Sequence, residues 1–337
     1  MSFRKGEKFL LSLFCFISCI VIRSVRILVF GTGGVGGFFG AKLAQAGNDV
    51  WFVARGDHLK SMRTAGLRIR STGSDIVIPP GKMTDEPRDA GPVDVVLFCV
   101  KSYDTEAAAR QLAPILHKDS VVLSLQNGVD NEEKISSLIS HGHVYGGVAY
   151  VSARIAAPGE ITETGGFQRI VFGPMGGPIT ERAREIHHLL VRAGIKTDLR
   201  EKVLNDLWNK FVFITSMGSF TAMSRLTQGE IIAQPETISL VCNAMHEVEA
   251  LAWKRGADIE PLNEPKMLEG MKRFESDTRS SMCYDLIGQK PLEVEALNGT
   301  VVRLGWELGV PTPIHAVIYA ALLPYHLKHV QLRRTRS

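Results

Sequence analysis

The 337-residue sequence is poor in cysteine, and its few cysteines follow no functional pattern. They are odd in number and far apart, at Cys15, Cys19, Cys99, Cys242 and Cys283. A C-x-x-C pair and a His/Cys spacing suited to a metal are both absent, which excludes the usual redox pairs and zinc sites. We therefore predict reduced core cysteines in a cytoplasmic protein, and no bound metal.

The sequence also lacks a large excess of either positive or negative charge. The 39 Lys and Arg face 35 Asp and Glu, which leaves a formal net charge of +4, and the basic residues are scattered among acidic ones. A nucleic-acid-binding domain usually concentrates positive charge on one face. The sequence thus predicts no nucleic-acid partner. It also lacks internal repeats and low-complexity linkers, and a chain of this length is expected to divide into two domains.

A long hydrophobic run is also missing, although residues 1–24 contain a short one. Basic residues at positions 4, 5 and 8 precede an apolar run over residues 9–22, a layout typical of a secretory signal. The run is shorter than the roughly 20 residues with which a helix crosses a bilayer, and no small-residue cleavage site follows it. Translation from near Val25, a membrane anchor and a signal stay open as interpretations. We favour the first and disfavour a membrane partner.

Glycine, by contrast, is plentiful, and a glycine-rich turn follows the apolar residues 27–30. The continuous apolar run indicates a strand buried on both faces of a parallel sheet. Gly31, Gly33 and Gly36 then form G-x-G-x-x-G, which permits a tight turn, close approach of a phosphate and close helix–strand packing. A helix pattern and a second strand complete a βαβ unit, so we predict a dinucleotide pyrophosphate at the helix N-terminus, with a purely structural turn as the alternative. The predicted cofactor-binding residues are Gly31, Gly33, Gly34, Val35 and Gly36.

The end of the second strand, at residues 49–54, predicts which dinucleotide binds. An acidic residue there would bind the ribose 2′-hydroxyl of NAD, whereas an arginine accommodates the 2′-phosphate of NADP. Arg55 occupies this position, and His58 and Lys60 add positive charge beside it. We predict NADP(H) as the cofactor, with Arg55 at its 2′-phosphate. The alternative is that Arg55 is a solvated loop charge.

Two further strand patterns deliver polar residues to the same edge of the predicted sheet. Residues 93–100 end at Lys101, and residues 121–126 end at Asn127. Ligands of open α/β sheets bind at the carboxyl ends of the strands. Lys101 is therefore expected at a phosphate or the substrate, and Asn127 at the nicotinamide ribose or the substrate. A solvated strand-end lysine and an Asn-Gly turn are the alternatives.

The periodicity changes near residue 198. Before it, strand-like residues 144–173 carry turn patterns at Pro158-Gly159 and Gly165-Gly166. After it only helical periodicity is found, beginning with a helix over about 200–230. We predict an α/β protein with an N-terminal Rossmann doubly wound sheet and an all-helical C-terminal domain. The predicted divisions are an apolar extension (1–24), the Rossmann domain (25–198), the helical domain (199–330) and a disordered basic tail (331–337).

Several motifs together resemble the ketopantoate reductase family over nearly all of residues 25–328. Besides the glycine turn and the basic end of the second strand, they are VKSYDT at 100–105, LQNGVDN at 125–131, LWNK at 207–210, SSMCYD at 280–285 and EVEALNG at 293–299. The resemblance implies NADPH-dependent reduction of 2-dehydropantoate, a small 2-keto acid, to pantoate in pantothenate biosynthesis. A homodimer is a further expectation.

The resemblance also assigns roles to single residues. Lys210 corresponds to the family's catalytic lysine, and Glu293 to the acidic partner at its active site. The predicted binding residues are Asn127 and Lys101 in the first domain and Ser281, the carboxylate-binding serine, in the second. Asp285 in the same motif is another substrate-binding candidate, with a simple capping or ion-pair role as the alternative.

The chemistry of keto-acid reduction agrees with these roles. Hydride arriving at the 2-keto carbon leaves negative charge on the oxygen, which must be stabilised and protonated. A lysine, with a reference pKa of about 10.4, is cationic at neutral pH and does both, while a nearby carboxylate orients it or holds the substrate. Without the resemblance, Lys210 and Glu293 would be interpreted as a solvated helix lysine and an ordinary helix N-terminus.

Two positions depart from the family pattern. One and two helical turns after Lys210, where the family commonly has substrate-facing asparagines, this chain has Ile214 and Gly218. The missing amides favour, as an alternative function, a related NADPH-dependent reductase of another 2-keto acid or an imine. A non-catalytic NADP(H) sensor, which would need neither Lys210 nor Glu293, and a membrane-anchored redox protein are rivals from other classes.

Overall fold

The computed structural model describes residues 25–271 and 277–336. Residues 1–24, with the predicted anchor or signal and with Cys15 and Cys19, lie outside the described residues. Within the described part, Cys242 and Cys283 are buried free cysteines and Cys99 is half-buried. No helix among these residues is both long and apolar enough to cross a membrane.

The N-terminal half contains a ten-stranded sheet in the order β4-β3-β9-β8-β7-β6-β1-β2-β5, with β10 paired to β9. The strands are β1 (Arg26–Phe30), β2 (Asp49–Val53), β3 (Leu67–Arg70), β4 (Ile76–Ile78), β5 (Met83–Thr84), β6 (Val93–Phe98), β7 (Leu116–Ser124), β8 (His143–Ala157), β9 (Glu160–Pro174) and β10 (Lys196–Leu199). The five neighbouring strands β2, β1, β6, β7 and β8 are parallel, so their carboxyl ends meet at one edge. The predicted Rossmann arrangement is confirmed.

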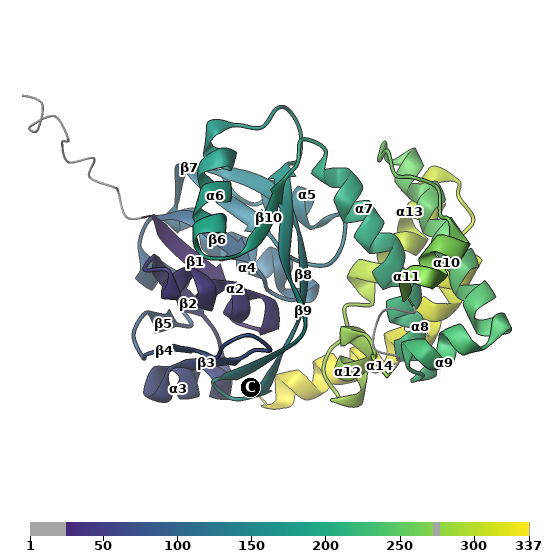
Figure 1. Cartoon of the computed structure of the whole chain (residues 1–337), viewed down its shortest axis with the longest axis horizontal. Helices are drawn as coiled ribbons and strands as arrows, with labels where there is room; N and C mark the ends of the chain where they lie inside the picture. The colour runs from purple at the N-terminus through teal and green to yellow at the C-terminus, as the bar shows by residue number, and fades with distance from the viewer. Residues whose placement is uncertain (1–24, 272–276, 337) are drawn as a thin grey trace, which may run out of the picture.

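Helices cover both faces of this sheet (Figure 1). They are α2 (Gly34–Gln45), α3 (Gly56–Ala65), α4 (Thr105–Leu112), α5 (Asn131–Ser136) and α6 (Glu181–Arg192), with 3₁₀ turns η1 (Pro87–Ala90), η2 (Ser102–Asp104) and η3 (Ala113–Ile115). Alternate residues of β1 enter two cores, one with α2, α3 and α6 and one with α4 and α5. Burial on both faces explains why β1 and β6 are continuously apolar.

The long hairpin of β8 and β9 confirms one predicted turn and corrects the other. Its turn lies at Pro158-Gly159, between the two strands. The predicted turn at Gly165-Gly166 is wrong, because both glycines lie inside β9. Pairing shifts there from Val151 with Gln168 to Ser152 with Thr164, so residues 165–167 bulge out of the ladder. The positive φ values of the two glycines, 87° and 69°, suit such a bulge.

The C-terminal half is helical among the described residues. Its elements are α7 (Val203–Phe213), η4 (Ile214–Gly218), α8 (Ser219–Ser224), α9 (Gln228–Ala233), α10 (Pro235–Lys254), α11 (Glu264–Met271), α12 (Ser281–Ile287), η5 (Glu295–Gly299), α13 (Thr300–Leu308) and α14 (Pro313–Arg336). The single helix expected over 200–230 is wrong. The α-helix α7 is followed by the π-helix η4 and then by α8, which ends where Arg225 takes a left-handed φ of 63°.

The last helix, α14, differs from the expectation at its end. The basic residues 331–337 were expected to be disordered, but α14 continues helical through Arg336. In Figure 1 this yellow helix leaves the helical domain and ends beneath the sheet domain, where the C-terminus is marked. The tail therefore bridges the two halves of the molecule.

The two halves also share apolar packing. The core of the helical half contains Val148 of β8 and Val171 of β9, together with Val129 from the loop after β7. They pack with residues of α7 such as Leu207 and Phe211, so α7 lies on the β8–β9 hairpin. The predicted division after residue 198 falls at the last residue of β10, and the hydrophobic core crosses it.

Candidate functional site

The glycine turn between β1 and α2 has the geometry that a bound phosphate needs. Gly31 has a φ of 100°, and a Cβ on it would lie 2.7 Å from the backbone nitrogen of Val100. A Cβ on Gly36 would overlap the carbonyl oxygen of Gly31, so this glycine permits close helix–strand packing. Gly33 instead faces open space, with nothing within 4 Å of its Cβ position, and precedes the first turn of α2. Gly33 therefore leaves room for the predicted pyrophosphate.

Two other residues of the predicted pyrophosphate site lie differently. A Cβ on Gly34 would overlap the backbone of Ala153 in β8, so that side of the helix start is covered by the hairpin. Val35 is half-buried and packs on the sheet core. Their contribution to a bound cofactor would therefore come through backbone N–H groups at the helix N-terminus.

Arg55 lies at the end of β2, as predicted, but the positive charge expected around it is cancelled. It is the N-cap residue of α3 and is exposed. Lys60 forms an ion pair with Asp57 at 3.0 Å. Burial lowers the pKa of His58, whose Nδ1 accepts a hydrogen bond from the backbone N–H of Gly159. His58 is therefore neutral at pH 7, and the expectation that it adds charge is wrong.

Lys101 lies where both halves of the molecule meet. Its Nζ donates to Oε2 of Glu293 at 2.9 Å and to Oδ2 of Asp285 at 2.8 Å. The other oxygen of Glu293 accepts from both the backbone N–H and the hydroxyl of Ser102 at 3.1 Å. Three residues predicted separately, at 101, 285 and 293, are thus brought together. Ser102 is a functional candidate that the sequence reasoning left without a role.

This cluster fixes the charge state of its members. Burial alone would raise the pKa of Glu293, whose side chain is 7% exposed. The charge of Lys101 and the hydrogen bonds from Lys101 and Ser102 outweigh burial and hold that pKa below its usual value. The two carboxylates likewise outweigh burial at Lys101 and raise its pKa. At neutral pH, Glu293 is an anion and Lys101 a cation.

Lys210 of α7 has the opposite environment. Its Nζ donates to the backbone carbonyl of Ala149 in β8 at 2.9 Å and lies 6.0 Å from the ring centroid of Tyr150. Burial lowers its pKa to about 8, and the negative charge of Glu293 only partly offsets that effect. Lys210 is near Glu293 but does not hydrogen-bond to it in the described structure. A lysine with such a pKa exchanges a proton readily near neutral pH.

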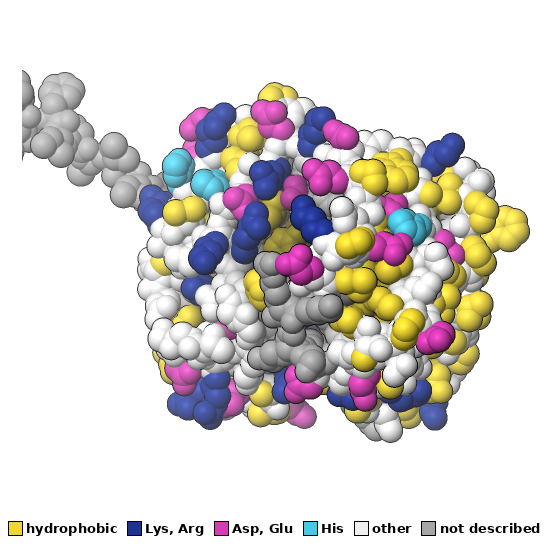
Figure 2. All heavy atoms as spheres, turned by 45° about the vertical axis from the view of Figure 1, so that its right-hand side comes forward, with side chains coloured by type: hydrophobic (Ala, Val, Ile, Leu, Met, Phe, Trp, Pro, Cys, Tyr) yellow, Lys and Arg dark blue, Asp and Glu magenta, His cyan; other side chains and the backbone are white. Residues whose placement is uncertain are grey.

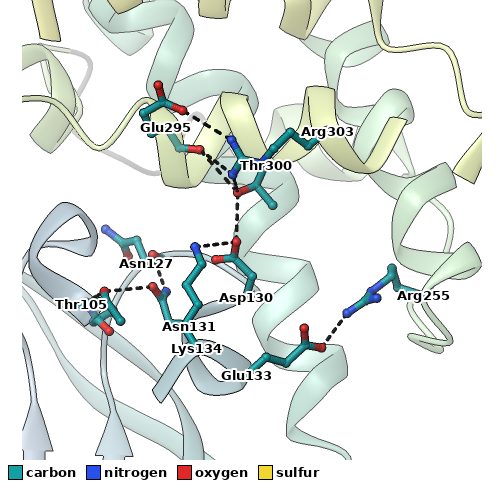
Figure 3. Close-up of polar contacts among 11 residues, drawn as sticks. Thr105, Asn127, Asp130, Asn131, Glu133, Lys134, Arg255, Glu295, Thr300 and Arg303 are labelled. Carbon is teal, nitrogen blue, oxygen red and sulfur yellow. Dashed lines mark hydrogen bonds and ion pairs between the residues drawn. The ribbon is translucent and has the colours of Figure 1, made fainter. Parts of the chain in front are cut away.

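Asn127 lies in the loop that follows β7, and other residues hydrogen-bond to this loop. Its carbonyl oxygen accepts from Nδ2 of Asn131 at 3.0 Å, while its own side-chain amide has no hydrogen-bond partner among the described residues. In Figure 3 that amide points away from the bracing contacts. Asn127 is therefore placed to offer its amide to a ligand.

The braces on this loop come from the helical half. The hydroxyl of Thr300 donates to Asp130 at 3.3 Å, and Arg303 donates to Thr300 at 2.9 Å (Figure 3). A pocket of about 220 Å³ lies here, but its cations are already paired: Lys134 with Asp130 at 2.7 Å and Arg255 with Glu133 at 2.6 Å. We interpret these contacts as an interdomain support for the Asn127 loop.

The two serines after residue 279 have different environments. Ser281, predicted to bind the substrate carboxylate, is exposed at the first turn of α12. Ser280 is the N-cap residue; its hydroxyl donates to the carbonyl of Gly218 at 2.6 Å and accepts from Cys283 at 3.1 Å. A Cβ on Gly218 would lie 3.6 Å from that of Ser280 and 4.0 Å from that of Ile214. Ile214, Gly218 and Ser280 therefore share one surface.

Polar side chains beside this surface hydrogen-bond among themselves. Ser219 donates to Asn298 at 2.7 Å, and Asn298 donates to the carbonyl of Thr215 at 3.1 Å. Thr221 donates to Ser280 at 2.7 Å. The bond from Asn298 to Thr215 joins the two π-helices η4 and η5, which follow Lys210 and Glu293 in the chain. Short π-helical segments are frequent at functional sites.

The face of the molecule between the two halves carries charges of both signs around a hollow (Figure 2). Among the described residues, no group of three His, Cys, Asp or Glu side chains is arranged to hold a metal ion. Together, a Rossmann sheet with an open glycine turn, a half-buried lysine and two acids that pair with Lys101 are the features expected of a dinucleotide-dependent oxidoreductase.

The family models are more specific. Residues 27–177 match ketopantoate reductase PanE/ApbA, and residues 202–326 match the C-terminal part of ketopantoate reductase PanE/ApbA. The chain belongs to the ketopantoate reductase family, and it is an oxidoreductase of the 2-dehydropantoate 2-reductase type.

Relatives support the family over nearly their whole length. The chain is 31% identical to the 2-dehydropantoate 2-reductase of Nostoc, covering 88% of this chain and 94% of that protein. It is 30% identical to the one of Archaeoglobus fulgidus, covering 88% and 96%. The crystal structure of a PanE/ApbA family ketopantoate reductase from Ralstonia eutropha superimposes with a TM-score of 0.83 at 29% identity, covering 90% and 99%.

Proposed function

We propose that the chain catalyses the NADPH-dependent reduction of 2-dehydropantoate to pantoate, a step of pantothenate biosynthesis. The observation that carries this proposal is Lys210, a lysine with a pKa lowered to about 8 that lies near the anionic Glu293 where the two halves meet. Keto-acid reduction needs a proton donor at that place. The relatives named 2-dehydropantoate 2-reductase support the choice of substrate.

The bound nicotinamide would supply the hydride, and the protein would supply charge and a proton. Lys210 donates a proton to the oxygen of the reduced carbonyl and stabilises its negative charge beforehand. Glu293 orients the substrate and favours the protonated form of Lys210. Asn127 offers its free amide to the substrate or the ribose. Ser281 and Asp285 remain proposed at the substrate, with Ser280 beside them.

Lys101 is assigned a place between cofactor and substrate. It was predicted as a cofactor contact, and its ammonium lies between Asp285 and Glu293. From this position, the aliphatic part of the Lys101 side chain would contact the nicotinamide end of the cofactor, and its ammonium would hold Glu293. Gly31, Gly33, Gly34, Val35 and Gly36 would hold the pyrophosphate and Arg55 the 2′-phosphate.

Few polar groups are free to bind the substrate's own hydroxyl. Ile214 and Gly218 have no side-chain group that can hydrogen-bond, and the polar side chains beside them hydrogen-bond to one another. A site with few free polar groups discriminates poorly for a hydroxyl, because the wrong substrate leaves nothing unpaired. This favours, as a second candidate, a related 2-keto acid with an apolar side chain.

A pair of substrates that differ by one oxygen tests the function. NADPH oxidation is measured with 2-dehydropantoate and with 3,3-dimethyl-2-oxobutanoate, the same skeleton without the hydroxyl. A kcat/KM for 2-dehydropantoate at least tenfold above that for the analogue supports pantoate synthesis. Comparable values support the wider keto-acid specificity, and no turnover with either compound contradicts the proposal. The Ile214→Asn variant, which restores an amide, should raise the preference for 2-dehydropantoate.

A further inference from the structure

The end of α14 docks on the turn that follows β6. Arg333 donates from Nη2 to Oδ2 of Asp104 at 3.0 Å, and its guanidinium lies 5.4 Å from the ring centroid of Tyr103. His326, two turns earlier in α14, has its ring 6.2 Å from the same tyrosine. Tyr103 and Asp104 belong to η2 of the Rossmann half, so the C-terminal helix is held there by a stack and an ion pair.

The same carboxylate oxygen binds a second arginine. Nη1 of Arg55 lies 3.7 Å from Oδ2 of Asp104, the oxygen that Arg333 also contacts. The two guanidinium groups therefore converge on one acceptor from different halves of the molecule. A phosphate group offers three acceptor oxygens, and it can replace or join a carboxylate between two arginines.

The local charge makes the second arginine necessary. Of the groups around Arg55, Lys60 is cancelled by Asp57 and His58 is neutral. Asp104 cancels Arg55 itself, so the predicted 2′-phosphate site would be neutral without a further cation. Arg333 restores a positive charge at this end of the cofactor site. A phosphate with about two negative charges at pH 7 needs such a surplus.

We infer that Arg333 is the second arginine of the NADP 2′-phosphate site, supplied by the C-terminal helix from the opposite half of the chain. This rests on the proposed NADPH dependence. Arg55 and Arg333 each donate to the phosphate, and Tyr103 stacks on Arg333 and keeps its guanidinium turned toward Arg55. The cofactor then closes the contact between α14 and the Rossmann half.

The test compares affinities for two cofactors that differ only in the 2′-phosphate. Dissociation constants for NADPH and NADH are measured by calorimetry on the full-length parent protein and on Arg333→Ala, Arg333→Lys and Arg55→Ala. Arg333→Ala should weaken NADPH by about tenfold and leave NADH within about twofold, because only NADPH carries the phosphate. Arg333→Lys should recover part of the loss, since it keeps the charge but not the planar fork.

Matched variants separate the inference from general damage. Arg184→Ala removes an exposed arginine of α6 that forms only a 3.9 Å ion pair with Glu181, and it should leave both affinities unchanged. Tyr103→Ala removes the stack without changing charge and should weaken NADPH a few-fold. If Arg55→Ala abolishes the NADPH preference while Arg333→Ala keeps it, the inference is overturned and the proposed function stands. If the parent binds NADPH and NADH equally, both the cofactor proposal and this inference are wrong.

Discussion

The two ends of the interdomain site differ in how they hold charge. At the proposed keto-acid end, Glu293 is almost completely buried, and its carboxylate accepts from Lys101 and Ser102. At the proposed phosphate end, Arg55 and Arg333 are 49% and 43% exposed and share one carboxylate oxygen of Asp104. Buried charges interact strongly and exposed ones weakly. The keto-acid end is therefore preorganised, whereas the phosphate end is soft enough to rearrange around a ligand.

The largest expected effect is at Lys210, the proposed proton donor. Lys210→Ala should lower kcat by about 10²- to 10⁴-fold, the usual contribution of general acid catalysis, while NADPH affinity stays nearly unchanged. Stopped-flow turnover and calorimetric binding check the two halves of this statement. Lys202→Ala, an exposed lysine at the start of the same helix, is the matched control and should change kcat by less than about twofold. Full turnover in Lys210→Ala would move the donor role to Lys101.

A substitution of Glu293, one of the two acids paired with Lys101, should lower activity somewhat less. Glu293→Gln keeps the shape but removes the charge that favours protonated Lys210 and holds Lys101, so kcat/KM for the keto acid should fall by roughly 30- to 100-fold. Glu307→Gln, on the exposed side of α13, is the control. Because Glu293 and Lys210 act together, the double variant should lose less than the product of the single losses. Independent, multiplying losses would separate their roles.

The pH dependence should expose the donor directly. Since Lys210 must be protonated and its pKa is lowered to about 8, kcat/KM should be constant below that pH and fall about tenfold for each pH unit above it. The profile is measured at saturating NADPH from pH 6 to 10. In Lys210→Arg, whose side chain does not titrate in this range, the alkaline decline near pH 8 should disappear. A decline that persists there would assign it to another group.

The smallest expected effect is at the proposed phosphate end, where a substitution should strengthen cofactor binding. Asp104→Asn removes the carboxylate that competes with the phosphate for both arginines, so NADPH should bind about two- to fivefold more tightly and NADH unchanged. Direct titration of the two cofactors measures this. Weaker NADPH binding would show that Asp104 positions the arginines more than it competes with the phosphate.

The sequence predicted the parts of the molecule that follow from local pattern. The apolar run of β1, the glycines at 31 and 36 and the long hairpin turn at Pro158-Gly159 are set by backbone geometry that glycine and burial dictate, and the structure confirms them. The family and the enzyme class followed from motifs spaced along the chain. The roles of single site residues remain predictions.

The missed features depend on contacts between distant residues. No local pattern shows that Asp104 meets Arg333, which is 229 positions away, or that Lys101 meets Glu293. The bulge at Gly165-Gly166 was mistaken for a turn because both need a positive φ, and only the pairing partner distinguishes them. The helical tail was mistaken for disorder because the contact between Arg333 and η2 cannot be seen in the local sequence.

The valines that β8 and β9 place in the helical core make the two halves one unfolding unit. Cutting the chain near residue 198 would expose Val148 and Val171 on one fragment and the matching face of α7 on the other, and would take from Lys210 its carbonyl partner Ala149. Neither fragment would keep an intact core, and each would present an apolar patch prone to aggregation. Thermal denaturation of the full chain should accordingly proceed as a single cooperative transition.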